Sequence, residues 1–505
     1  MRQAAVRFVL ALAFGLGAAS GALAQTNLRI GLGDDGDVLD PTLSRFYTTR
    51  IMFAALCDKL FDIDEKGNIV PQLALGAETS ADGKTVTMKL RPGVKFHNGE
   101  PFDAAAAKYS LDRHLTMKGS FRRSELSVVD SVEVVDPLTI KLNLKAPFSP
   151  LLAQLTDRAG MMMAPKATEA AGDKFALHPV CAGPYKFVER IPQDRIVVEK
   201  FADYWNKDQV FIDRITYRPI VDSTIRLANL KSGSLDLIER VLATDIKDVR
   251  SNPKLRLSKA TSLGWVGLLI NMNNGPKSNN PLGKDPRVRQ AFELSLDRDA
   301  INQVVFNGEF TPGNQWVNPQ SPFYQKAFPV PKRDLGKAKA LMQEAGIKMP
   351  VTIDFMVTSG PETQAVAEVV QSMAAEAGFD LKLRVTEAAT AQKQAEDGQY
   401  QLYMNNWSGR IDPDGNTVLY QTCTGPMNMG KYCDKEVDAL HEQARTASDL
   451  AARNAAYEKL AARFLQNGWI IYLYHPQYLI ASTDRVEGFK PMPDGLLRVV
   501  GVKLK

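Results

Sequence analysis

Cysteine and histidine are scarce in this sequence, and long apolar runs are absent. Its 505 residues include four cysteines and five histidines, with no C-x-x-C and no H-E-x-x-H spacing. These absences exclude a disulfide-dense scaffold and argue against a dedicated metal site. No stretch beyond the N-terminus approaches the roughly 18 apolar residues of a membrane-spanning helix. The formal charge of +5, from 62 basic and 57 acidic residues, is too small for nucleic acid to be the main partner.

Motifs for nucleotide hydrolysis and acyl transfer are also missing. There is no G-x-x-x-x-G-K-[ST] and no G-x-S-x-G, which argues against ATP hydrolysis and against a nucleophile elbow. The run from Asp412 resembles the start of a calcium loop, but Gly415 and Cys423 occupy the wrong positions for one. We therefore predict a binding protein without a cofactor, and keep a periplasmic hydrolase or chaperone as an alternative of a different class.

The first 24 residues have the three parts of a secretory signal peptide. Arg2 and Arg7 precede an apolar run over residues 8–16, and small residues ending in A-L-A follow. The apolar run is too short to cross a bilayer of about 30 Å. Because Gln25 and not cysteine follows the predicted cleavage site, we expect a mature chain without a lipid anchor, free in the periplasm.

Export makes the cysteines candidates for oxidation. Cys423 and Cys433 enclose a short loop rich in glycine and proline, T-G-P-M-N-M-G-K-Y, and we predict a disulfide there, contributing about 2–3 kcal/mol. Cys57 and Cys181 are expected either to form a long-range bridge or to remain two buried thiols, and the sequence slightly favours the thiols.

Hydrophobic periodicity predicts a mixed α/β chain. Strands are expected over residues 27–32 and 85–90, a hairpin over 132–144, and a helix over 104–114 with Asp103 as its N-cap. A long helix is expected over 285–306 and another after Asp334. A β-α-β-α-β alternation follows over 351–404, which is typical of an α/β lobe. The Pro/Asn/Gly-rich change near 265–285 predicts a boundary between two lobes.

Five segments carry a joint resemblance to one family. They are LRPGVKFHNGEPFDAAAAKYSLDRHL (90–115), CAGPYKF (181–187), FADYWNKDQVFIDRITYRPIVDSTIRLANLKSGSLDL (201–237), DPRVRQAFELSLDRDAI (285–301) and DLGKAKALMQEAGI (334–347). Together they resemble the family-5 extracellular solute-binding proteins of ABC importers, of the dipeptide-, oligopeptide- and nickel-binding type. The resemblance covers nearly the whole mature chain in the expected order.

The resemblance implies a two-lobed periplasmic binding protein of type II-like α/β fold. Lobe I would comprise residues 25–270 plus 473–505, with an extra subdomain over about 51–175, and lobe II residues 271–472. Ligand would be buried between the lobes at a hinge. The closed form would then dock on a membrane permease driven by a cytoplasmic ATPase.

Ligand chemistry is expected in the loop that follows the predicted strand 400–405. This loop contains Trp407, Ser408, Gly409, Arg410 and Asp412, and ligands of α/β sheets bind beyond the carboxyl ends of strands. Trp407 could stack on ligand, and Gly409 would allow close backbone approach. Similar dipeptide-binding proteins hold the peptide ammonium with an aspartate here. Arg410 occupies that place, or the loop is one residue shorter and Asp412 is displaced, and either departure speaks against ordinary dipeptide binding.

Three interpretations of Arg410 stay open at this point. It could clamp a ligand carboxylate with its planar guanidinium. It could pair with Asp412 or Asp414 and brace the loop, or it could be a solvated surface charge.

Weaker candidates lie elsewhere. Tyr47 and Thr48 could line the cleft after the first strand, or could equally pack at a helix start. Gln364 lies near where dipeptide-binding proteins place an arginine for the peptide carboxylate. Trp316 and Tyr324 could be cleft walls or core.

We therefore predict the periplasmic substrate-binding component of an ABC transporter. Its expected ligand is a peptide-like or opine-like solute with a carboxylate, and its partners are that small molecule and the permease subunits, with no nucleic acid. The alternative of the same type is a nickel-chelate or haem receptor. We expect a monomer.

Overall fold

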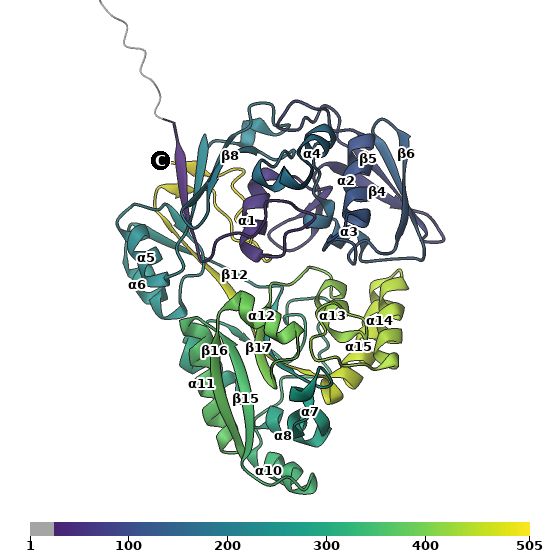
Figure 1. Ribbon diagram of the computed structural model, residues 1–505. Helices are drawn as coiled ribbons and strands as arrows, with labels where there is room; N and C mark the ends of the chain where they lie inside the picture. Colours follow the sequence, from purple (N-terminus) through teal and green to yellow (C-terminus); the bar gives the residue numbers. More distant parts are fainter. Residues whose placement is uncertain (1–24) are drawn as a thin grey trace, which may run out of the picture.

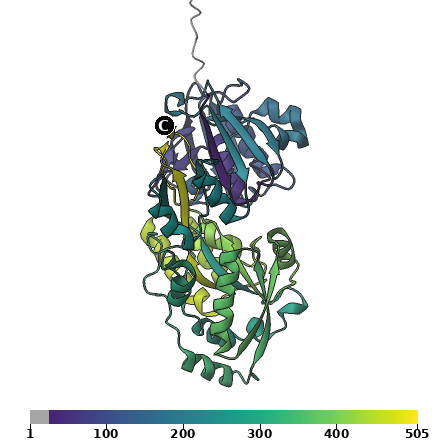
Figure 2. The same ribbon diagram turned by 90° about the vertical axis from the view of Figure 1, so that its left-hand side faces the viewer.

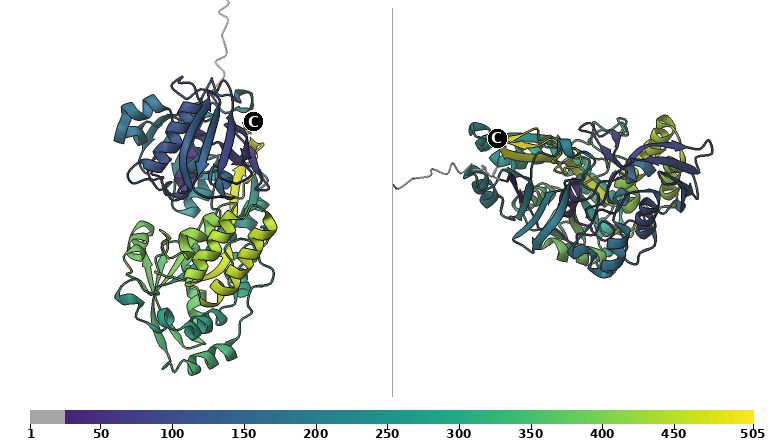
Figure 3. Two further views of the ribbon diagram at one scale, coloured as in Figure 1. Left: turned by 90° about the vertical axis from the view of Figure 1, so that its right-hand side faces the viewer. Right: turned by 90° about the horizontal axis from the view of Figure 1, so that it is seen from above.

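The computed structural model describes residues 25–505. The predicted signal peptide, residues 1–24, lies outside the described residues. The chain forms two lobes, placed one above the other in Figure 1 and meeting at a narrower junction in Figure 3. Ligand sites occur preferentially at domain interfaces, so the junction is the expected location of a site.

Lobe I is built on a seven-stranded mixed sheet. Its order is β12 (Leu255–Thr261), β19 (Gln477–Thr483), β11 (Leu237–Ile238), β1 (Asn27–Leu32), β10 (Arg214–Pro219), β9 (Arg195–Lys200) and β8 (Tyr185–Ile191). The predicted first strand is confirmed, because Leu28, Ile30 and Leu32 are completely buried. Its helices are α1 (Tyr47–Leu56), α5 (Ser223–Lys231) and α6 (Ile246–Ser251).

A subdomain with its own core extends lobe I. Its antiparallel sheet has the order β4 (Ala74–Thr79), β5 (Thr85–Leu90), β7 (Thr139–Leu144) and β6 (Val129–Asp136). Helix α2 (Ala104–Thr116) packs on it, and Asp103 caps α2 by accepting a hydrogen bond of 2.9 Å from the Ala106 N–H. The predicted strand, hairpin, helix and cap are confirmed. The smaller elements here are β2 (Phe61–Ile63), β3 (Ile69–Pro71), α3 (Leu151–Gln154) and α4 (Pro165–Ala171).

Lobe II is a six-stranded sheet covered by helices. Its order is β14 (Thr311–Pro312), β18 (Ile470–His475), β13 (Trp265–Ile270), β17 (Leu402–Trp407), β15 (Val351–Thr358) and β16 (Phe379–Thr386). The predicted β-α-β-α-β unit is present, because α11 (Pro361–Ala375) and α12 (Ala388–Glu396) connect the parallel strands β15, β16 and β17. The other helices are α7 (Pro281–Lys284), α10 (Leu335–Glu344), α13 (Asp414–Gln421), α14 (Lys435–Thr446) and α15 (Leu450–Asn467).

The long helix predicted over residues 285–306 is wrong. Two helices occupy the range, α8 (Pro286–Leu294) and α9 (Arg298–Phe306). The Asp297 carboxylate accepts a 2.9 Å hydrogen bond from the Ala300 N–H and so begins α9. An aspartate side chain that caps a new helix prevents the preceding helix from continuing past that residue. The apolar periodicity runs through both helices and therefore did not reveal the break between them.

The chain crosses between the lobes in two short segments. Residues 262–264 join β12 to β13, and Pro476 joins β18 to β19. In Figure 2 the yellow C-terminal strands pass from the lower lobe into the upper one. Because β13 and β18 pair in the lobe II sheet, the limit expected at residue 270 places all of β13 in the other lobe. The limit expected at residue 473 falls within β18 and divides that strand. The small antiparallel pair β20 (Val486–Glu487) and β21 (Lys503–Leu504) completes the chain.

Candidate ligand-binding site

The carboxyl ends of parallel strands from both lobes meet at the junction. β1 runs parallel to β10 and β11 in lobe I, and β15 runs parallel to β16 and β17 in lobe II. Two contacts cross the junction here, one from the segment after β11 and one from the start of the neighbouring strand β19. The Ala243 N–H donates to a Glu362 carboxylate oxygen at 3.3 Å, and the Tyr478 hydroxyl donates to the Ser408 carbonyl at 3.3 Å. Ligands of α/β sheets bind at such an edge, so the junction is the candidate site.

Two stacked tyrosines form the lobe I side of the junction. The rings of Tyr47 and Tyr478 lie 5.8 Å apart with an interplanar angle of 5°. The Tyr47 hydroxyl donates to the Gly495 carbonyl at 2.7 Å, and burial raises the pKa of Tyr47 well above its ordinary value. Tyr47 is therefore neutral and offers an aromatic face. Thr48, the next residue, is 2% exposed in the first turn of α1, as the helix-packing interpretation expects.

Arg240 lies beside these tyrosines and was missed from the sequence. It directly follows Glu239, the residue after β11, and has a φ of 52°, which only a minority of non-glycine residues adopt. Its guanidinium lies 5.5 Å from the centre of the Tyr47 ring, and it donates to Asp34 at 2.7 Å. Its side chain is 44% exposed. A strained residue that presents a guanidinium at the junction is typical of a functional position, but no one-dimensional motif marks it.

Asn416 organises the predicted ligand loop. Its side-chain oxygen accepts hydrogen bonds from the Trp407 indole N–H at 3.0 Å and from the Arg410 backbone N–H at 2.7 Å. Its amide donates back to the Arg410 carbonyl at 3.1 Å. Trp407 is half-buried, and its indole N–H is used within the loop, so stacking through its face is the contact that remains.

Gly409 is required by the protein backbone. Its φ is 78°, and a Cβ atom there would collide with the Leu263 carbonyl carbon in the first crossing segment. The close approach expected at this glycine is therefore an approach to a neighbouring segment of the same chain. Gly409 fixes the loop against the crossing segment.

Arg410 pairs across the junction with a residue that the sequence did not suggest. Its Nε lies 2.9 Å from the Asp157 carboxylate in lobe I, and the residue is 8% exposed. Arg50 of α1 donates to the same carboxylate at 3.1 Å and to the Ser408 hydroxyl at 3.2 Å. Burial alone would raise the pKa of Asp157, but Arg410 and Arg50 outweigh it and hold that pKa well below its ordinary value. An ionic contact thus joins the two lobes.

The expected loop brace through Asp412 or Asp414 is wrong, and so is the solvated Arg410. Asp412 accepts two hydrogen bonds of 2.8 Å from Arg453, and Asp414 lies 2.8 Å from the Arg445 guanidinium. Both acids already have partners in lobe II, which leaves Arg410 for Asp157. Burial raises the pKa of Asp414 to about 6, against the opposing charge of Arg445.

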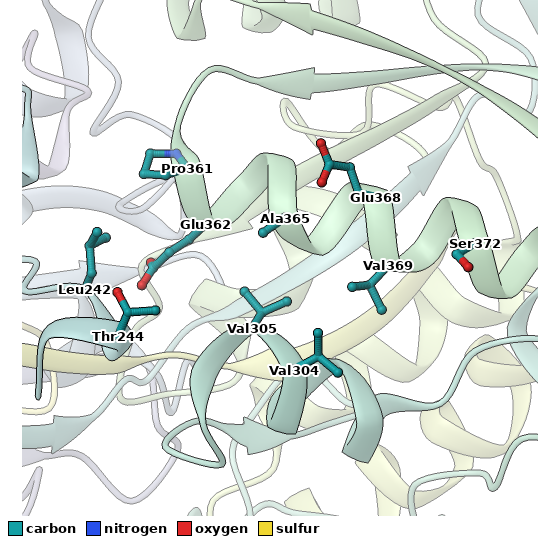
Figure 4. Close-up of a pocket in the computed structure, with 10 residues that line it drawn as sticks. All are labelled: Leu242, Thr244, Val304, Val305, Pro361, Glu362, Ala365, Glu368, Val369 and Ser372. Atoms are coloured by element: carbon teal, nitrogen blue, oxygen red, sulfur yellow. The ribbon is translucent and has the colours of Figure 1, made fainter. Parts of the chain in front are cut away.

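Gln364 lies in the first turn of α11, half-buried, next to a pocket at the junction. The pocket has a volume of about 510 Å³. Figure 4 shows its walls from both lobes, with Glu362 turned toward Thr244. Burial raises the pKa of Glu362. The residues that line the pocket are Leu242, Thr244, Val304, Val305, Pro361, Glu362, Ala365, Glu368, Val369 and Ser372.

All four cysteines are joined in pairs. The predicted Cys423–Cys433 disulfide is present, with the Cα atoms 4.3 Å apart. Cys57 and Cys181 also form a disulfide, with the Cα atoms 4.9 Å apart, so the preference for two buried thiols is wrong. The reason is tertiary, because α1 packs against β8 and brings the C-cap of α1 beside Cys181.

Residues 68–428 match the bacterial extracellular solute-binding proteins, family 5. The chain belongs to this family. The glutathione-binding protein GsiB of Pectobacterium atrosepticum is 30% identical, with 92% of each chain covered, and that of Salmonella typhi is 29% identical, with 94% of each covered.

Solved structures agree with this assignment. The periplasmic binding protein AgaA of Agrobacterium tumefaciens R10, in complex with agropinic acid, superposes with a TM-score of 0.85 at 28% identity over 95% of this chain and 99% of that one. Helicobacter pylori DppA, in complex with the peptide STSA, superposes with a TM-score of 0.85 at 23% identity, over 95% and 98% of the two chains. The two-lobed binding-protein fold predicted from the resemblance is confirmed. The chain is thus a family-5 extracellular solute-binding protein with a two-lobed fold.

Two further observations concern residues 25–505 only. No helix in this range is long and apolar enough to cross a membrane. Within the same range, no group of three histidine, cysteine, aspartate or glutamate residues is arranged to hold a metal ion.

Proposed function

We propose that this protein is exported to the periplasm and captures a peptide-like or opine-like solute between its lobes. The solute carries a carboxylate, and the loaded protein delivers it to a permease in the inner membrane. The protein acts as a monomer, and residues 1–24 are removed on export. The relatives that support this ligand class are the glutathione-binding GsiB and the agropinic-acid complex of AgaA.

The observation that carries the proposal is the pairing of Arg410 with Asp157 across the junction. This contact, the Arg50 contact with Ser408 and the Tyr478 contact with the Ser408 carbonyl all join lobe I to lobe II. Such contacts are lost when the lobes separate, so they favour the closed arrangement. A ligand then shifts the equilibrium toward closure through contacts that it makes only there.

The ligand contacts follow from the same geometry. Trp407 and the stacked tyrosines Tyr47 and Tyr478 offer apolar faces on the two sides of the junction. Arg240 offers a half-exposed guanidinium, which suits a carboxylate. Ser408 and Gln364 supply polar groups from lobe II, while Asp412 and Gly409 support the loop.

Mass spectrometry of small molecules that co-purify with the mature protein tests the proposal. We expect one dominant carboxylate-bearing solute, bound reversibly at one molecule per protein in calorimetry. Glutathione and agropinic acid serve as the first candidates for titration. Conversion of the bound solute into a product would favour a hydrolase, and the absence of saturable binding to any carboxylate-bearing solute would overturn the proposal.

A further inference from the structure

A group of buried arginines surrounds the interlobe ion pair. The arginine cluster consists of Arg50, Arg122, Arg158 and Arg410, each 8% exposed or less. Among residues 25–505, only two carboxylates contact these four guanidinium groups, those of Asp157 and Glu125. The cluster therefore holds an excess of positive charge away from water, which is unfavourable unless an anion joins it.

Backbone carbonyls take up some of the donors without offsetting the charge. Arg158 donates to the Ser44 carbonyl at 3.0 Å, and Arg122 donates to the same carbonyl at 3.2 Å and to Glu125 at 2.5 Å. Arg158 Nε lies 3.8 Å from the Asp157 carboxylate, beyond hydrogen-bond distance. Two cluster arginines therefore share one neutral oxygen.

Two donors of the cluster are left over. The Nε atoms of Arg122 and Arg158 are buried and have no hydrogen-bond partner among the described residues. Buried N–H groups of this kind nearly always have an acceptor in a native protein. Burial and the neighbouring Arg122 charge also lower the pKa of Arg158 well below its ordinary value. Charge and hydrogen bonding thus point to the same missing group, an acceptor with negative charge.

The cluster adjoins the candidate site. Arg50 reaches from the cluster to Ser408 at 3.2 Å, and the Arg410 guanidinium lies 4.9 Å from the centre of the Trp407 ring. An anion at the cluster would therefore be continuous with a ligand held between Trp407 and the tyrosines.

We infer that the arginine cluster is an anion subsite and that the natural ligand carries at least two carboxylates. This inference rests on the proposed function and narrows its ligand class. Two carboxylates would match the excess of two guanidinium groups, and carboxylate oxygens would supply acceptors for the free Nε atoms. An inorganic oxyanion with two negative charges has the same chemistry, so the experiment separates the two sources.

Calorimetric titration and thermal unfolding of the mature protein with simple anions test the inference. At matched ionic strength we expect glutarate to bind at least 10-fold more tightly than butyrate and to raise the unfolding temperature by several degrees. Inorganic phosphate should have less effect than glutarate. Equal responses to glutarate and butyrate would overturn the inference, and a phosphate response above that of glutarate would overturn the carboxylate assignment.

Variants of the cluster arginines test whether glutarate binds at the cluster. Arg158→Gln should weaken glutarate binding at least 10-fold in the calorimetric titration. Arg122→Gln is an independent second variant with the same expected result. Arg298→Gln is the matched control, because Arg298 is buried in lobe II and pairs with Glu293 outside the cluster. A glutarate response that survives both cluster variants would overturn the inference.

A second probe separates this inference from the proposed function. Glutathione has two carboxylates, and its glycine ethyl ester has one. Tight binding of glutathione with at least 10-fold weaker binding of the ester supports both proposals. Equal binding of the two overturns the inference and leaves the proposed function standing. If neither binds while glutarate binding still depends on Arg158, the anion subsite stands and the peptide-like ligand class fails.

Discussion

The interlobe pair of Arg410 and Asp157 makes the sharpest prediction for ligand binding. Arg410→Ala removes a buried charge-assisted contact with a distance of 2.9 Å. Contacts to charged groups contribute about 1.5–3 kcal/mol. Asp157 keeps Arg50 as a partner, and losing one of four guanidinium groups relieves repulsion, so we expect about 2 kcal/mol. The closed form loses this amount and the open form does not, so affinity should fall by about 30-fold.

A double-mutant cycle with Asp157→Asn decides how Arg410 acts. If Arg410 acts through Asp157, the loss in the double variant should be close to the larger single loss, with a coupling of about 1–2 kcal/mol. Calorimetry with the co-purified solute gives the affinities, and small-angle scattering without ligand should show a more open Arg410→Ala protein. Additive losses, together with unchanged scattering, would refute the latch and restore Arg410 as a direct clamp on the ligand.

Three further predictions concern stability. Gly409→Ala should lower the free energy of unfolding by about 3 kcal/mol in urea titration, because its φ is 78° and the new methyl meets the Leu263 backbone; an unchanged midpoint would contradict the contact. Burial raises the pKa of Asp414 to about 6 from 3.8, so the folded state holds that proton more tightly than the unfolded state. Stability relative to Asp414→Asn should therefore be greatest below pH 4 and fall by roughly 2–3 kcal/mol as the pH rises through 6, and a flat difference would show that Arg445 keeps the group ionised. Replacing Cys57 and Cys181 with serine opens a link across 124 residues and should cost about 3–5 kcal/mol in the chain-entropy model; in the wild type, both thiols should resist alkylation until reduction.

Local sequence patterns predicted most of the fold. Strand alternation gave β1 and the β15–β17 unit, and Asp103 and Asp334 cap their helices as expected. The errors arose where tertiary pairing decides. The apolar strand β13 was assigned to the wrong lobe because its membership depends on pairing with β17 and β18, which no local pattern records.

The candidate site was harder to predict because its charges come from distant segments. Arg410 was found from its place after a strand, yet its partner Asp157 lies 253 positions earlier in lobe I. Arg50, Arg122 and Arg158 occur in unremarkable surroundings in the sequence. Only the folded chain brings Arg50 and Arg158 to the Asp157 carboxylate, with Arg122 paired to Glu125. Arg240 carries a further signal, its positive φ, that exists only in three dimensions.

The position of β19 determines when the first lobe can fold. In the lobe I sheet, β19 lies between β12 and β11, and it is made of residues 477–483, near the end of the chain. A nascent or translocating chain that has delivered residues 25–470 still has this sheet divided, with β12 detached from β11 and both edges exposed. The N-terminal lobe is thus the last to be completed although its first strand emerges first. The lobe I sheet can therefore become continuous only after residues 477–483 are available to pair with β11 and β12.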